Sequence, residues 1–139
     1  MFNLILHLPA KQDILNQANS AIMDIEVFRK LALSFPETIE APHFEKTSFR
    51  INKGKIFATL DAKAGNACLK LSEVDQSIFC GIDAATIYPV NNKWGKQGWT
   101  IIALKTVKKN ILKDALSKAY LVAVPKKVAQ KKIVINKQL

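Results

Sequence analysis

The sequence predicts a small α+β domain organised around an antiparallel β-meander, and three observations lead to this prediction. Apolar and polar residues alternate along residues 47–51, 55–61 and 67–71, which is the period of half-buried strands. The connections at 52–55 and 62–66 are short and contain Asn and Gly, which tolerate the positive φ of tight turns. Apolar residues recur at helical spacing before and after this segment, so we expect a helix on each side of it.

The helix before the meander is predicted from an apolar stripe and from its two ends. Asp24 is a good N-cap residue, and the helix should end before Pro36, which disfavours helical backbone at the preceding residue. The stripe consists of Ile25, Phe28, Ala32 and Phe35. Residues 37–45 contain Pro42 and three glutamates, and we expect them to form an irregular connection.

Between the meander and the last helix, the sequence predicts one short helix and two further strands. We expect the helix over residues 73–80, a fourth strand over 86–90 and a fifth over 99–104. Pro89 places the fourth strand at an edge, because proline cannot donate a hydrogen bond to a neighbouring strand. Residues 91–98 are expected to be a loop.

A long amphipathic helix is expected to begin at Thr106 or Val107. Its apolar stripe consists of Val107, Ile111, Leu112, Ala115, Leu116 and Ala119. Lysines lie on the opposite face, at positions 108, 109, 113 and 118. The predicted fold is therefore a sheet of about five strands packed against an N-terminal and a C-terminal helix.

The length of 139 residues and the hydrophobic content of 49% fit one folded domain. We expect this domain to cover residues 23–125, followed by a basic tail over 126–139. Residues 1–22 are expected to be either an extension or the product of an upstream start. Their apolar run is shorter than the roughly 20 residues that span a bilayer, and no basic segment precedes it, so neither an anchor nor a secretory signal is expected.

Charge is the strongest compositional signal of function. Twenty-one Lys and Arg against 11 Asp and Glu give a net charge of +10, which favours nucleic acid or anionic lipid as a partner. A basic surface that serves solubility alone is the alternative. Arginine occurs only at Arg29 and Arg50. Because lysine is a hydrated point charge and arginine the usual reader of guanine, nucleic acid would be held mainly by its backbone.

Catalytic and metal chemistry find little support in the sequence. Cys68 and Cys80 are too few for a closed zinc site or a disulfide scaffold, and buried reduced thiols in a cytoplasmic protein are expected. His7 and His43 are single histidines without a partner at ligand spacing, and no phosphate-binding glycine motif occurs. We therefore predict a protein without cofactor, metal or enzymatic activity.

Several stretches together resemble the MmcQ/YjbR family, small bacterial proteins whose fold is similar to that of the frataxin-like CyaY proteins. The stretches are FRKLALSFP at 28–36, APHF at 41–44, SFRI at 48–51, KIFATL at 55–60, WGKQGWT at 94–100, and ALSKAY at 115–120 through AVPKK at 123–127. The resemblance covers about residues 23–127. It implies an antiparallel sheet with helices on one face, and it implies no catalytic residues.

The resemblance also implies DNA binding, because the family's two β-hairpins have been likened to paired wings. On this hypothesis, double-stranded DNA would contact cations and one aromatic residue around the first hairpin and the 91–98 loop. The candidates are Lys46, Arg50, Lys53, Lys55, Lys93, Trp94 and Lys96. Lysines can instead protect exposed strands from edge pairing, and Trp99 is expected to belong to the core. A module that binds a protein through the open sheet face or the 91–98 loop is the second hypothesis.

Overall fold

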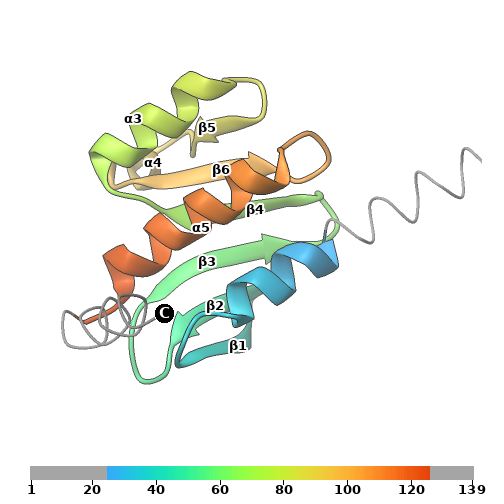
Figure 1. Cartoon of the computed structure of the whole chain (residues 1–139), viewed down its shortest axis with the longest axis vertical. Coiled ribbons are helices and arrows are strands. Elements are labelled where there is room, and N and C mark those ends of the chain that lie inside the picture. The colour runs from blue at the N-terminus through green and yellow to red at the C-terminus, as the bar shows by residue number, and fades with distance from the viewer. Residues whose placement is uncertain (1–24, 126–139) are drawn as a thin grey trace, which may run out of the picture.

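The computed structural model describes residues 25–125, which form an antiparallel sheet with helices packed on it (Figure 1). The strands are β1 (Thr38–His43), β2 (Lys46–Ile51), β3 (Ile56–Asp61), β4 (Asn66–Lys70), β5 (Ile87–Pro89) and β6 (Trp99–Ala103). Their order across the sheet is β1-β2-β3-β4-β6-β5. The predicted meander is thereby confirmed as β2, β3 and β4, and the strand containing Pro89 lies at an edge, as expected.

The prediction of an irregular connection over residues 37–45 is wrong, because β1 occupies most of it and brings the sheet to six strands. The strand pairs with β2 along its full length, from Thr38 opposite Ile51 to His43 opposite Lys46. Pro42 is tolerated because an edge strand leaves one side unpaired. The charge of Glu40 is balanced by Arg29 of the N-terminal helix, whose Nε donates to Oε2 over 2.7 Å.

The helices differ from expectation mainly at their ends. The N-terminal helix is described over residues 25–33, so its predicted cap Asp24 lies outside the described residues, as do the predicted segments 1–22 and 126–139. The other helices are α3 (Glu73–Ile82), α4 (Lys93–Lys96) and α5 (Lys109–Ala123). The prediction of a loop over residues 91–98 is wrong at 93–96, which form the short helix α4 because the Asn92 side chain caps its first turn. None of the helices within residues 25–125 has both the length and the apolar character needed to cross a bilayer.

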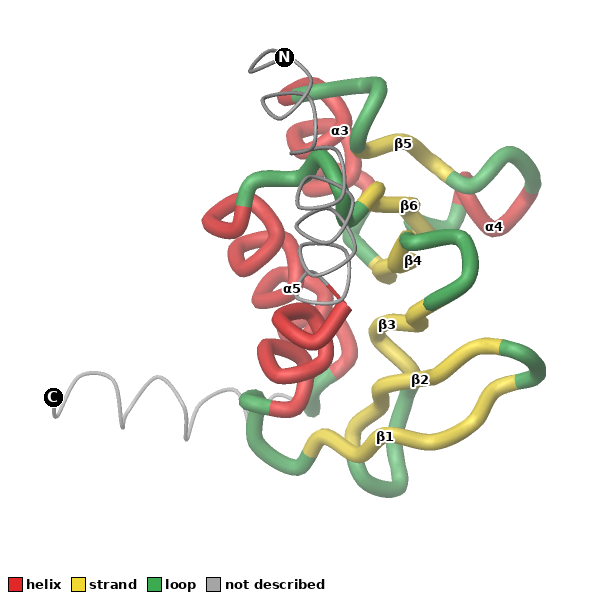
Figure 2. The backbone as a smooth tube through the Cα atoms, turned by 90° about the vertical axis from the view of Figure 1, so that its right-hand side faces the viewer, coloured by secondary structure: helices red, strands yellow, loops and turns green. Residues whose placement is uncertain are grey.

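The hydrophobic core lies between the sheet and the helices that cover one of its faces (Figure 2). Tyr120 of α5 is completely buried, stacks on Phe35 at a centroid distance of 4.7 Å and donates its hydroxyl to the carbonyl of Pro36. Phe28 of the N-terminal helix meets Phe49 of β2 edge to face. These aromatic contacts fix both helices on the same side of the sheet and leave the other side uncovered by them.

The turns agree with the sequence at one position and differ at another. Gly65 has φ +71°, as the second turn of the meander was expected to require. In the first turn the positive φ falls on Lys53 and not on Asn52 or Gly54. Gly54 is needed for another reason: a Cβ there would lie 3.0 Å from Cβ of Ile51, which is tighter than ordinary packing.

Candidate functional site

The face of the sheet opposite α3 and α5, here called the open face, carries the candidate site (Figure 2). Residues directly opposite one another in antiparallel strands share a face, so the register defines the open face once the core residues are known. Lys46 lies opposite His43, Cys68 opposite Ile101, and Trp99 opposite Lys70. The open face consists of Ile39, Ala41, His43, Lys46, Ser48, Arg50, Ile56, Thr59, Asp61, Asn66, Cys68, Lys70, Tyr88, Trp99, Ile101 and Ala103.

A groove of about 330 Å³ crosses the open face. This volume lies within the range of roughly 300–1,000 Å³ that is typical of ligand sites. The groove is lined by His43, Lys46, Ile56, Thr59, Cys68, Val90, Trp94 and Trp99. Residues from β1, β2, β3, β4 and β6 therefore meet a wall formed by Trp94 of α4 and by Val90.

Trp94 is held at the groove by a short helix whose backbone is closely fitted to the sheet. The side chain of Asn92 caps α4 and accepts the N–H of Trp94 at 2.8 Å. The next residue must be glycine, because a Cβ on Gly95 would lie 1.9 Å from the carbonyl oxygen of Val90. Even so, Trp94 itself is 49% exposed, so packing does not explain why a large aromatic residue occupies this position.

Two side chains from neighbouring elements fix the α4 segment further. The Gln76 amide of α3 donates to the carbonyls of Gly95 and Trp99, at 2.9 and 3.3 Å, and to Oγ1 of Thr100 at 3.1 Å. The Lys70 ammonium donates to the carbonyl of Gln97. These bonds tie α3, β4 and β6 to the segment that carries Trp94, so the indole is presented on a rigid support.

Trp99 is half-buried and lines the groove, so the expectation that it belongs to the core is wrong. Its neighbours Thr100 and Ile102 point into the core instead, and both are completely buried. The polar Thr100 can take an inward position because Gln76 donates to its hydroxyl, which in turn donates to the carbonyl of Gly98. The predicted strand is present, and its burial alternates so that Trp99 lies on the open face and Thr100 on the core face.

The turn between β1 and β2 forms another edge of the site. His43 lines the groove and contacts Phe44 edge to face, with the ring centroids 4.9 Å apart. Phe44 is 94% exposed and has φ +58°, a left-handed backbone conformation that costs a non-glycine residue roughly 1–3 kcal/mol. Both the exposure and the backbone conformation oppose stability, so Phe44 is a second exposed aromatic residue without a structural explanation.

The seven residues predicted to contact nucleic acid are all exposed, and the structure brings most of them to one end of the sheet. Arg50 lies opposite Ile56 at the end of β2, and Lys53 and Lys55 follow in the turn. This end of the sheet also carries α4, with Lys93, Trp94 and Lys96, because Lys70 at the end of β4 pairs with Trp99.

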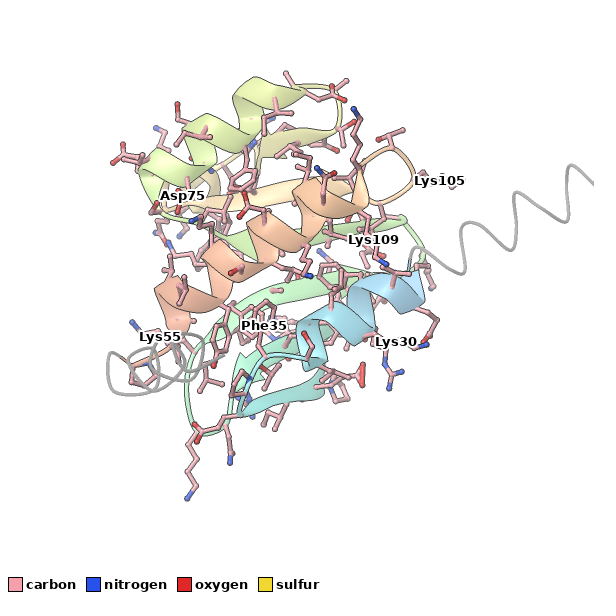
Figure 3. The ribbon with its side chains drawn as sticks, in the orientation of Figure 1. Lys30, Phe35, Lys55, Asp75, Lys105 and Lys109 are labelled. Carbon is pink, nitrogen blue, oxygen red and sulfur yellow. The ribbon has the colours of Figure 1, made fainter. Side chains whose placement is uncertain are left out.

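The distances within this set follow from the strand order. Two strands, β3 and β4, separate β2 from β6, which corresponds to about 14 Å at an interstrand spacing of ~4.8 Å. Lys46 is the first residue of β2, at the other end of this strand from Arg50, and it nevertheless lines the groove. Figure 3 shows Lys55 at one end of the strands and Lys105 at the other. The predicted cations thus surround the groove in part and do not form one compact cluster.

Negative charge is concentrated away from the groove. Glu26 and Glu40 pair with Arg29 on the helix side, and Asp75 lies on α3 (Figure 3). On the open side of the described residues, Asp61 and Glu45 stand at a strand end and in a turn. No acidic residue is among those that line the groove. The arrangement therefore favours an anionic ligand on the open face.

The groove contains one thiol, Cys68, whose reactivity is set by its surroundings. Burial raises the pKa of the Cys68 thiol to about 11, although the nearby Lys46 ammonium acts in the opposite direction. Cys68 is therefore neutral near pH 7 and is a weak nucleophile. Both cysteines are free thiols, and residues 25–125 contain no group of three or more His, Cys, Asp and Glu side chains placed to hold a metal ion.

Three residues that line the groove, His43, Thr59 and Cys68, were not predicted from the sequence as site residues. The sequence suggests His43 as a loop residue or an isolated metal ligand, Thr59 as a strand residue and Cys68 as a buried thiol. Cys68 and Cys80 are in fact both partly exposed, so the prediction of buried thiols is wrong. The alternation of Ile39, Ala41 and His43 is the signal that would have identified β1 and, with it, the contribution of His43 to the groove.

Comparisons with known proteins add a family and a fold. A family model described as YjbR matches residues 33–122. The crystal structure of the Deinococcus radiodurans protein DR2400, described by its family-model domain DUF419, is similar with a TM-score of 0.60 and 22% sequence identity. The similarity covers 68% of this chain and 73% of that protein, and at this identity it supports the fold alone. A search of curated proteins finds no match.

Proposed function

The chain belongs to the YjbR family, and from this premise we propose that it is a non-enzymatic DNA-binding protein whose lysines contact phosphate. The observation that carries the proposal is a groove on the open face that cations border and that no acidic residue lines. On the helix side Glu26 and Glu40 are paired with Arg29, and the lysines of α5 add positive charge there, so the open face is the side whose cations surround a groove. Two free cysteines fit a cytoplasmic location for this activity.

The distribution of lysine and arginine predicts the kind of contact. Lys53, Lys55, Lys93 and Lys96 are exposed and belong to turns or to the short helix α4. Such contacts neutralise phosphates and release counterions, so the affinity should fall steeply with salt. They fix the position of the nucleic acid without reading its sequence.

The experiment compares two triple variants that remove the same charge from opposite sides of the full-length protein. Arg50→Gln/Lys93→Gln/Lys96→Gln alters the open side, and Lys109→Gln/Lys113→Gln/Lys118→Gln alters α5 as the matched control. Fluorescence anisotropy with a labelled duplex is measured over a series of salt concentrations. We expect the first variant to reduce the slope of log K against log salt by about 2–3 units, since each phosphate contact contributes about 0.9.

The control variant should change the slope by less than one unit, because its lysines lie on the other side of the sheet. Equal changes in both variants would show that net charge alone attracts the DNA, which contradicts an interface on the open side. Absence of duplex and single-strand binding by the unaltered protein would refute DNA binding itself.

A protein-interaction role is the second candidate, and one observation on α3 favours it. Val74, Ile78 and Ile82 recur every four residues and are 69%, 57% and 53% exposed, which makes an apolar stripe on the solvent side of the helix. Sedimentation of the full-length protein over a range of concentrations tests one form of this role, self-association. An assembly that Ile78→Gln dissociates would favour it, and a monomer at all concentrations would count against it.

A further inference from the structure

The groove on the open face has the composition of a site that stacks a flat ring. Trp94, Trp99 and His43 present ring systems from α4, β6 and β1, and Ile56 and Val90 contribute apolar surface. Aromatic side chains in a positively charged groove are the usual means of holding bases of single-stranded nucleic acid. The Lys93 ammonium lies over one face of the Trp94 ring, 5.5 Å from its centroid, so a positive charge accompanies the indole and the opposite ring face is the one offered to a base.

We propose that this groove binds an unpaired base of single-stranded DNA, with the phosphates of the strand along the surrounding cations. The inference rests on the proposed DNA-binding function and specifies the form of DNA. In a duplex the base faces are stacked on one another and the grooves offer only base edges. An indole that needs a ring face therefore selects a strand whose bases are free.

The polar residues of the groove can hold such a base in position. His43, Lys46 and Thr59 line the groove and offer hydrogen-bonding groups to the polar edge of a base. Arg50 lies near the end of β2, and Lys93 begins α4, the helix that precedes β6; β2 and β6 are three strand spacings apart, so the backbone on each side of the bound nucleotide can reach a cation.

The apolar wall favours deoxyribose over ribose. Ile56 and Val90 offer no partner to a 2′-hydroxyl, and burying a hydroxyl without a hydrogen bond is unfavourable. A deoxyribose can lie against these side chains without that cost.

Phe44 extends the site beyond the groove. It is 94% exposed beside His43 and offers a second ring to a neighbouring base. The site therefore fits a strand of at least two nucleotides, one inside the groove and one on the turn.

The chain supplies its own probe, because Trp94 and Trp99 are its only two tryptophans and both line the groove. Unlabelled dT12, its duplex with dA12 and the corresponding oligouridine are titrated into the full-length protein, with excitation of tryptophan. Anisotropy with the labelled oligonucleotides measures affinity in parallel. The variants are Trp94→Ala and, as an exposed aromatic control on the open face outside the groove, Tyr88→Ala.

We expect dT12 to quench tryptophan fluorescence and to bind more tightly than the duplex. Trp94→Ala should weaken dT12 binding by about 5- to 150-fold, the range of one lost base stack, and leave duplex binding within about twofold. Tyr88→Ala should change neither. Near-ultraviolet circular dichroism and urea unfolding confirm that each variant is folded.

Other outcomes separate this inference from the proposed function. Duplex binding that equals or exceeds dT12 binding, without quenching, would overturn the base site and leave phosphate-led DNA binding in place. Tighter binding of oligouridine would overturn the assignment to DNA. Failure of the protein to bind any of the three would overturn both proposals.

Discussion

Replacing Gln76 by methionine tests whether the support of Trp94 is as rigid as the hydrogen bonds indicate. The amide donates to three acceptors, and a typical hydrogen bond contributes about 0.5–1.5 kcal/mol net. Independent losses would sum to roughly 1.5–4.5 kcal/mol. That sum is too large here, because no acceptor is left without a partner.

Each acceptor keeps another hydrogen bond when the amide is removed. The carbonyl of Gly95 still accepts the N–H of Gly98 at 3.1 Å, and the carbonyl of Trp99 still accepts the N–H of Val90 at 3.0 Å. The Thr100 hydroxyl still donates to the carbonyl of Gly98 at 2.9 Å. We therefore expect Gln76→Met to lower the free energy of unfolding by about 1–2 kcal/mol, at the low end of the sum.

Urea unfolding followed by tryptophan fluorescence measures this effect, because both tryptophans adjoin the affected segment. With an m value of roughly 1–2 kcal/mol/M, the midpoint should fall by about 1 M. Gln76→Glu should cost more than Gln76→Met, since a carboxylate would face two carbonyl oxygens. The exposed Ser77 on the same helix supplies the control, and Ser77→Ala should stay within about 0.5 kcal/mol.

Two results would refute this reasoning. A Gln76→Met variant as stable as the unaltered protein would show that the amide does not hold the α4 segment. Equal losses for methionine and glutamate would show that packing, and not hydrogen bonding, determines the residue. If the reasoning holds, Gln76→Met should also weaken dT12 binding although Gln76 does not line the groove.

Three further predictions concern single positions. Phe44→Gly should raise the free energy of unfolding, measured by urea unfolding, by up to about 1 kcal/mol, because glycine tolerates φ +58°. The same substitution should weaken dT12 binding. A loss of stability would contradict the strain assigned to Phe44. Gly98→Ala should lower the free energy of unfolding by at least about 2 kcal/mol in the same assay, because Gly98 has φ +107° and a Cβ would lie 1.9 Å from the carbonyl oxygen of Leu71. The control is Gly81→Ala, which should be neutral or stabilising because a Cβ there meets open space. Alkylation of Cys68 at pH 8 should be roughly 100-fold slower in the folded than in the urea-unfolded protein, because the raised pKa of about 11 favours the neutral thiol. Mass spectrometry of the labelled peptide measures the two rates, and equal rates would contradict the raised pKa.

The sequence allowed the meander and the last helix to be predicted because their patterns are local. Alternation along β2, β3 and β4 and the stripe of α5 each depend on residues a few positions apart. The strand β1 was missed because Pro42 and the glutamates are typical of loops. What stabilises β1 is not local: Glu40 is neutralised by Arg29, and one side of Pro42 faces no neighbouring strand.

For the candidate site, the sequence predicted which cations contact the ligand but not the groove that they surround. Composition and the resemblance identified Lys93, Trp94 and Lys96, and all are exposed as a contact surface requires. The groove itself could not be predicted, because it is assembled from five strands and α4. The face occupied by Trp99 depends on Gln76 satisfying the hydroxyl of Thr100, a contact between residues 24 positions apart.

The rigid support of an exposed indole is the strongest reason to expect a function on the open face. Gly95 and Gly98 each permit a close approach that a Cβ would prevent, and Gln76 and Lys70 bind the backbone of the same segment. A segment kept only for stability would be expected to bury its largest side chain, whereas this one leaves Trp94 half in solvent. Sites that bind ligands need positions fixed by such surrounding contacts, because ordering them on binding would reduce affinity. Substitutions between the sheet and α5 should therefore alter unfolding, the loss of the exposed Trp94 indole should mainly alter binding, and substitutions in the support of α4, such as Gln76→Met, should alter both.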